Sequence, residues 1–131
     1  MDLLELMKKR RSIRSYTSED ISEENLDKIL SAGLLSASGR AIRPWELIVV
    51  RNQDTLRKMA DSRDHGAKML EGANAAVIVI ADETKTDVWT EDCSAAMTNM
   101  HLMADCLGVG SCWVQGRLRE ASDGRTTEEF I

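Results

Sequence analysis

Apolar residues recur at helical spacing in three stretches of the chain. A capping-box pattern at Asp2 and Glu5 predicts a short first helix that ends in a run of basic residues. Ser22 caps a second predicted helix that ends near Leu35, and the longest helix is predicted over residues 87–107. The apolar faces consist of Leu3, Leu4 and Met7 in the first helix, Leu26, Ile29, Leu30 and Leu34 in the second, and Trp89, Cys93, Ala96, Met100, Met103 and Leu107 in the third.

Three short apolar runs predict β-strands. Residues 46–50 (ELIVV) form the first run. Residues 75–81 (AAVIVIA) are apolar without alternation, which indicates a strand buried on both faces. Residues 111–114 follow the glycines that end the longest helix, and they predict a third strand. A short helix is predicted over residues 52–62 and a helical turn over residues 67–70.

The C-terminal residues contain another helix signal. Thr126 and Glu129 form a capping-box pattern, yet Ile131 is the last residue. A helix of five or six residues is marginal by itself. We therefore expect a truncated natural sequence or a chain whose last segment is absent. No linker divides the chain, so residues 1–131 are predicted to form one domain.

Composition excludes several classes of protein. The 17 basic and 22 acidic residues give a net charge of −5, which argues against a general nucleic-acid binder. No apolar run approaches the ~20 residues of a membrane span, and the N-terminus lacks the pattern of a signal peptide. The three cysteines are odd in number and widely spaced, which suits free thiols in a reducing cytoplasm.

The most distinctive polar stretch is KKRRSIRSY, residues 8–16. Its arginines and serines can converge on a compact anion, and a phosphate monoester fits the planar donors of arginine. A solvated basic loop or a small nucleic-acid patch is the alternative interpretation. Two further loop-like segments follow regular elements, residues 36–45 (SASGRAIRPW) and 108–117 (GVGSCWVQGR). Neither is a Walker loop or a dinucleotide-binding glycine motif.

Taken in order, these motifs resemble the nitroreductase family of flavoproteins. The resemblance covers residues 3–117 and includes RRSIRSYT, ILSAGLLSASGR, IRPWELIVV, AAVIVIAD and LGVGSCWVQG. It implies an α+β fold, a three-layer α/β/α sandwich with a central mixed, largely antiparallel sheet. It also implies a homodimer with FMN at the subunit interface and NAD(P)H as the electron donor.

The resemblance also assigns cofactor-binding residues. The segment near the N-terminus would hold the FMN phosphate and ribityl chain, the loop before Pro44 would reach the flavin from the other subunit, and the segment after residue 114 would lie along the ring. These residues are Arg10, Arg11, Ser12 and Arg14 in the first segment, Ser38, Gly39 and Arg40 in the second, and Gln115 and Gly116 in the third, next to Val114.

Two departures from the family pattern stand out. Ala41 and Arg43 occupy positions where family members often carry Asn and Gln. The family chain also normally continues further, with a strand that crosses to the partner subunit and a basic residue for the phosphate.

The function that the resemblance implies is an FMN-dependent oxidoreductase that passes electrons from NAD(P)H to nitroaromatic, quinone or similar electron-poor compounds by a ping-pong mechanism. The flavin performs the chemistry, so no catalytic side chain is assigned. No metal site is assigned either, because His101, Cys93 and Cys106 do not share a helix face at metal-ligand spacing. The alternatives are a flavin-binding protein without turnover and an anion- or nucleic-acid-binding module. No membrane partner is expected.

Overall fold

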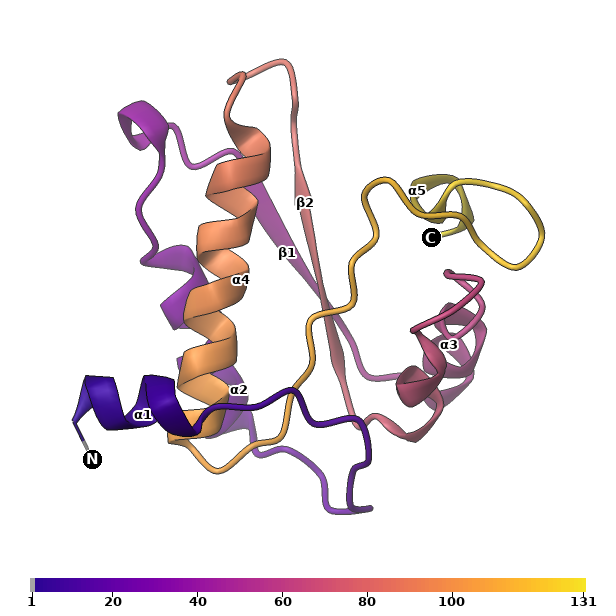
Figure 1. The fold of residues 1–131 in the computed structure, drawn as a ribbon, viewed down its shortest axis with the longest axis horizontal. Coiled ribbons are helices and arrows are strands. Elements are labelled where there is room, and N and C mark those ends of the chain that lie inside the picture. Colours follow the sequence, from indigo (N-terminus) through magenta and orange to yellow (C-terminus); the bar gives the residue numbers. More distant parts are fainter. Residues whose placement is uncertain (1) are drawn as a thin grey trace.

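The computed structural model describes residues 2–131, and Figure 1 shows the long helix α4 beside α2 and a sheet of two strands, with α3 and α5 on the far side of the sheet. Short 3-10 helices, η1 and η2, precede the two strands. The elements in chain order are α1 (Leu3–Lys9), α2 (Glu23–Leu34), η1 (Gly39–Ala41), β1 (Trp45–Val50), α3 (Gln53–Met59), η2 (Lys68–Gly72), β2 (Ala76–Ala81), α4 (Trp89–Cys106) and α5 (Thr127–Phe130).

The predicted helices and their caps are largely confirmed. Asp2 accepts a hydrogen bond from the backbone N–H of Glu5, and Ser22 accepts one from Asn25. The capping box at the C-terminal helix forms in full, with both of its bonds present. The short helix predicted over residues 52–62 ends earlier, at Met59. Residues 67–70 do form a helical turn, as part of η2.

The sheet is antiparallel, with a register that runs from Trp45 opposite Ala81 to Val50 opposite Ala76. Both strands therefore lie within one residue of their predicted bounds. The prediction that β2 is buried on both faces is wrong, because the strand is half-buried and Ile80 is 42% exposed. The sheet contains two strands in the described part of the chain, so much of β2 borders an open groove rather than a covered core.

The third predicted strand does not form. Within residues 2–131, residues 111–114 belong to no helix or strand, and their one hydrogen bond between backbone groups joins the Ile13 N–H to the Ser111 carbonyl at 2.9 Å. A strand requires a partner that continues the ladder. Val114 instead packs against the apolar cluster around Leu56.

Two apolar clusters form the core. One joins α3 and η2 around the fully buried Leu56, and the other joins α2 and α4 around Ile29 and Met100. Leu34, predicted on the apolar face of α2, is 52% exposed and is the last residue of that helix. Among the described residues, no helix combines the length and hydropathy of a membrane span.

Gly33 determines how closely α2 approaches α4. A Cβ atom there would lie 2.8 Å from Cγ and 2.9 Å from Sδ of Met100, with Leu47 at 3.4 Å behind. We expect Gly33→Ala to lower the free energy of unfolding by about 1–3 kcal/mol, because the added methyl overpacks the contact. Urea denaturation measures the change.

Gly72→Ala is the matched control. A Cβ atom at Gly72 would meet nothing within 4 Å, so this variant should unfold at the wild-type urea concentration or slightly above it. An equal loss of stability in both variants would contradict the close helix contact.

Candidate functional site

The basic N-terminal segment leaves α1 at Arg10 and continues without regular secondary structure past the lower end of α4 (Figure 1). Nη1 of Arg10 lies 2.8 Å from Nε2 of His101 on α4. Arg11 bends back, and its Nη1 donates to the carbonyls of Lys8 and Arg10 at 2.9 and 2.7 Å. Ser12 and Arg14 are exposed. The segment thus presents a row of hydroxyl and guanidinium donors beside α4.

The segment after α4 packs against this basic segment. Nδ1 of His101 lies 2.5 Å from Oγ of Ser111, whose carbonyl accepts the Ile13 N–H. A Cβ atom on Gly110 would lie 3.0 Å from the Ile13 side chain, so a glycine is needed for this close approach. The structure therefore brings the first and third predicted segments together.

His101 is held in its neutral form. Burial and the positive charge of Arg10 lower the pKa of His101, although the nearby Asp105 carboxylate acts in the opposite direction. Burial likewise raises the pKa of Tyr16, with a further contribution from the neighbouring Cys112. This corner of the molecule therefore carries the charges of its arginines and of Asp105, but neither a protonated imidazole nor a phenolate at neutral pH.

The second predicted segment lies at the other end of α4. The Gly39 N–H donates to Oδ1 of Asp92 at 2.9 Å, and the Arg43 N–H donates to Oγ of Ser38 at 3.1 Å. Asp92 is nine residues before His101, which corresponds to about 13 Å along the helix. Within one chain, residues 38–40 are therefore not brought together with the basic segment.

The Asp92 carboxylate is an unusual feature of this end. It is 5% exposed, and its Oδ2 atom has no hydrogen-bond partner within residues 2–131. The adjoining loop is strained, because Arg40, Ala41 and Arg43 have φ angles of 54°, 55° and 53°. Left-handed backbone costs a residue with a Cβ atom roughly 1–2 kcal/mol. Asp92 fixes the loop in this conformation through Gly39.

Some polar groups of the third segment are hydrogen-bonded to one another. Nε1 of Trp113 donates to Oε1 of Gln115 at 3.0 Å, and Nε2 of Gln115 donates to the carbonyl of Arg117 at 3.1 Å. Gly116 is half-buried, and a Cβ atom there would lie 3.3 Å from Thr127. The Gln115 amide is therefore oriented by its own loop.

A groove of about 1450 Å³ runs between α4, β2 and the first and third segments. Single small-molecule sites typically occupy about 300–1000 Å³, so this groove can accept more than one small ligand or a further segment of protein.

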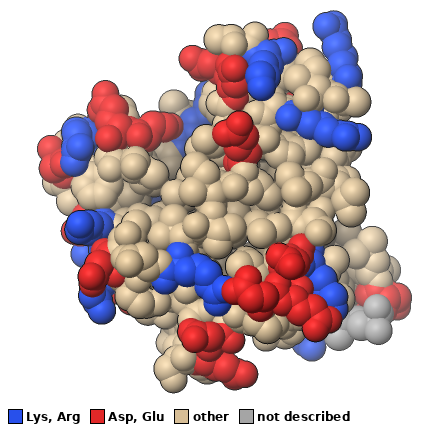
Figure 2. All heavy atoms as spheres, turned by 180° about the vertical axis from the view of Figure 1, so that it is seen from behind, with Lys and Arg blue, Asp and Glu red and all other residues tan. Residues whose placement is uncertain are grey.

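Charged side chains are unevenly distributed on the face opposite to the view in Figure 1. Figure 2 shows a broad uncharged area across the middle of this face, with most charged side chains around its edges.

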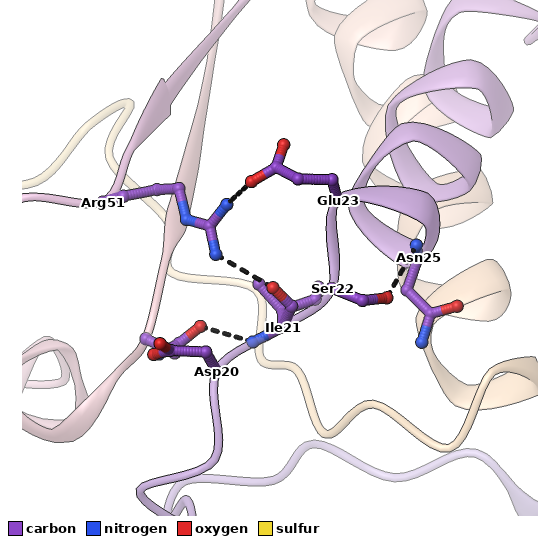
Figure 3. A network of polar contacts seen from close by, with 7 residues as sticks. Asp20, Ile21, Ser22, Glu23, Asn25 and Arg51 are labelled. Carbon is purple, nitrogen blue, oxygen red and sulfur yellow. Dashed lines mark hydrogen bonds and ion pairs between the residues drawn. The ribbon is translucent and has the colours of Figure 1, made fainter.

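The first segment is also anchored where it leads into α2. Arg51 donates to the carbonyl of Ile21 at 2.9 Å and pairs with Glu23, as Figure 3 shows. Asn74 accepts the Ile21 N–H at 2.7 Å and donates to Asp20. The segment is therefore held at both ends, by His101 and Ser111 at the start and by side chains adjoining β1 and β2 at the finish.

The sequence profile of the Nitroreductase family matches residues 7–65 and 61–130. The chain belongs to the nitroreductase family. A protein of Archaeoglobus fulgidus, provisionally named NADH dehydrogenase/NAD(P)H nitroreductase, is 43% identical over 117 residues, and a protein of Methanothermobacter thermautotrophicus with the same name is 42% identical over 116. Each alignment covers 86% of this chain, which spans 67% and 60% of the two relatives' lengths.

A solved nitroreductase-family structure has the same arrangement. The FMN-dependent nitroreductase of Clostridium difficile R20291 superimposes with a TM-score of 0.95 at 42% identity, covering 98% of this chain and 75% of that one. The predicted α+β nitroreductase fold class is therefore confirmed, although the sheet of this chain has two strands within residues 2–131.

Two residues that hold these segments, His101 and Asp92, are not among the site residues that the sequence predicts. His101 contacts Arg10 and Ser111, and Asp92, in the first turn of α4, binds Gly39. No local pattern signals either role, because the partners are 91 residues apart for His101 and 53 for Asp92.

Asn74→Ala should loosen the end of the basic segment. The variant leaves the half-buried Ile21 N–H without its acceptor, so we expect a loss of about 1–3 kcal/mol and faster hydrogen exchange at Ile21. Asn25→Ala is the control, since Asn25 joins the network through its backbone N–H. Unchanged protection of Ile21 in Asn74→Ala would show that the anchor is unimportant.

Proposed function

We propose that this chain is an FMN-dependent oxidoreductase that passes electrons from NAD(P)H to nitroaromatic, quinone or similar electron-poor small molecules. The observation that carries the proposal is the correspondence of 98% of the chain with an FMN-dependent nitroreductase at a TM-score of 0.95. The large groove beside the basic segment adds a location for the cofactor and the substrates.

The basic segment fits a flavin phosphate. Arg11, Ser12 and Arg14 supply exposed donors, and Arg10 keeps further N–H groups beyond the one directed at His101. Arginine binds phosphate oxygens through parallel hydrogen bonds. We assign the phosphate and ribityl contacts to these four residues.

The third segment fits the flavin ring. Gly116 lines the groove, and the Gln115 amide is held in place by Trp113 and Arg117. We assign Gln115 and Gly116 to the ring edge, where amide groups tune the electronics of a flavin. When bound, FMN supplies two-electron transfer between the nicotinamide and the acceptor, while the side chains of this chain bind, orient and leave one face open. The first substrate leaves the groove before the second enters, which is a ping-pong order.

The remaining assigned residues, Ser38, Gly39 and Arg40, require a second copy of the chain. They lie at the far end of α4 from Arg10, so we propose that they reach the flavin of the partner subunit in a homodimer. Exposed apolar side chains support such an interface, among them Leu3, which is 62% exposed, and Leu35, which is 83% exposed. The oligomeric state is measured by light scattering after gel filtration.

We also propose that residues 1–131 act as one nitroreductase-like domain in the cytoplasm. The chain matches the family along almost its whole length. Its three cysteines are free thiols, as expected in a reducing compartment.

The activity is tested on purified protein loaded with FMN in the absence of oxygen. Flavin absorbance that NADH or NADPH bleaches, and that a nitroaromatic or quinone restores, is the expected result. Flavin that binds but is not bleached would instead identify a binding protein without turnover. Failure to bind FMN, together with salt-sensitive binding of oligonucleotides, would favour the nucleic-acid module.

Arg14→Ala should weaken FMN binding by roughly tenfold to hundredfold. A hydrogen bond to a charged group contributes about 1.5–3 kcal/mol, and the variant removes at least one from the phosphate. Titration of FMN fluorescence measures the dissociation constant. Arg57→Ala, which removes the same charge from an exposed pair with Asp54 on α3, should bind FMN as the wild type does. Equal affinity in the two variants would overturn the phosphate assignment.

A further inference from the structure

We propose that His101 is a positioning residue that holds Arg10 toward the flavin phosphate while its imidazole is neutral, and that acidification releases Arg10. The proposal rests on the function proposed above. It follows from a chain of three side chains, Arg10, His101 and Ser111, that lie next to one another at the junction of α1, α4 and the segment after α4.

The hydrogen bonds of this chain fix the state of the imidazole. A guanidinium group has donors and no acceptor, so Nε2 of His101 must accept the bond from Arg10. Nε2 therefore carries no hydrogen. In the neutral ring the hydrogen then resides on Nδ1, which donates to Oγ of Ser111 at 2.5 Å. Only one tautomer of one protonation state satisfies both partners.

A second contact closes this chain into a ring. The carbonyl of Ser111 accepts the Ile13 N–H at 2.9 Å, so residues 10–13 are attached at two points to His101 and Ser111. Arg10 is half-buried, whereas Arg14 is exposed. Of the two arginines, Arg10 is therefore the one whose direction depends on a protein partner.

Protonation breaks the arrangement. A hydrogen on Nε2 would face the guanidinium N–H, with two donors and two positive charges about 2.8 Å apart. The charged groups that act on His101 are Arg10, from the segment after α1, and Asp105, further along α4. The segment after α4 faces it with the Ser111 hydroxyl, followed by Cys112, which lies near Tyr16.

The direction of the pH dependence follows from these surroundings. Burial and Arg10 lower the pKa of His101, so the folded protein binds this proton less readily than the unfolded chain does. The neutral imidazole of His101 therefore contributes its full stabilisation of the folded state above the ordinary histidine pKa of about 6.5. This stabilisation is lost as the pH falls from about 6.5 through the lowered pKa of His101 in the folded protein.

The imidazole state is measured first, in flavin-free protein. The chain has two histidines, and comparison with the His65→Gln variant assigns the signals of His101. We expect nitrogen NMR spectra to show His101 as the neutral Nδ1–H tautomer, with a titration midpoint below the ordinary histidine value of about 6.5. A midpoint at or above that value, or a hydrogen on Nε2, would overturn the proposal.

The effect on FMN is measured with two matched variants, His101→Gln and His101→Asn. The Gln amide reaches the position of Nε2 and can accept from Arg10, whereas the shorter Asn amide reaches only the position of Nδ1. At about pH 8, His101→Gln should bind FMN as the wild type does, and His101→Asn should bind about two- to tenfold more weakly.

Acidification through the His101 midpoint that the NMR titration gives separates a positioning role from a structural one. Wild-type affinity should fall about two- to tenfold more than that of His101→Gln, which cannot take up the proton. The FMN phosphate itself titrates near pH 6, but it does so equally in both proteins and cancels in their ratio. The same ratio at both pH values would refute the coupling.

The outcomes also separate this inference from the proposed function. If the wild-type protein fails to bind FMN at either pH, the proposed function falls and the positioning role falls with it. If FMN binds, but the His101 spectrum or the affinity ratio contradicts the expectation, only the role of His101 is wrong. Should His101→Gln fail to fold, Arg10→Ala replaces it: without the guanidinium beside Nε2, the titration midpoint of His101 is expected to rise, and an unchanged midpoint would refute the contact.

Discussion

The close packing of α2 on α4 at Gly33 is the contact on which the rest of the structure depends. It holds α4 beside β1 and β2, with Met100 in the core. The two ends of α4 then position different functional segments, the basic segment through His101 and the strained loop through Asp92. A single rigid helix therefore fixes the spacing of groups that belong to separate loops.

The elements of this fold could be predicted from sequence because their signals are local. Caps such as Ser22 and the helical spacing of apolar residues act within a few positions, and both strands were located within one residue. The failures concern non-local partners. Residues 111–114 have the composition of a strand, but the described chain provides no ladder for them, and no short-range pattern indicates how much of β2 will be covered.

In the candidate site, too, the local motifs could be recognised from the sequence, whereas contacts between distant residues could not. The order of the motifs identified the family, and it led to Arg10 and Arg14 as phosphate residues, which remain a proposal. What the order could not supply is the orientation of each side chain. His101 lies on a face of α4 that looks like ordinary packing, and its role depends on an arginine 91 residues away. The left-handed backbone at Ala41 was equally hidden, because alanine gives no signal of that conformation.

The ring that joins Arg10 and Ile13 to His101 and Ser111 has a consequence for the order of events during synthesis. The ribosome makes His101 some 91 residues after Arg10. At typical translation rates of about 5–20 residues per second, this gap lasts roughly 5 to 20 s. During that interval Arg10 and Ile13 lack the partners that orient them, so this part of the basic segment can take its final conformation only after α4 and the segment behind it have been made.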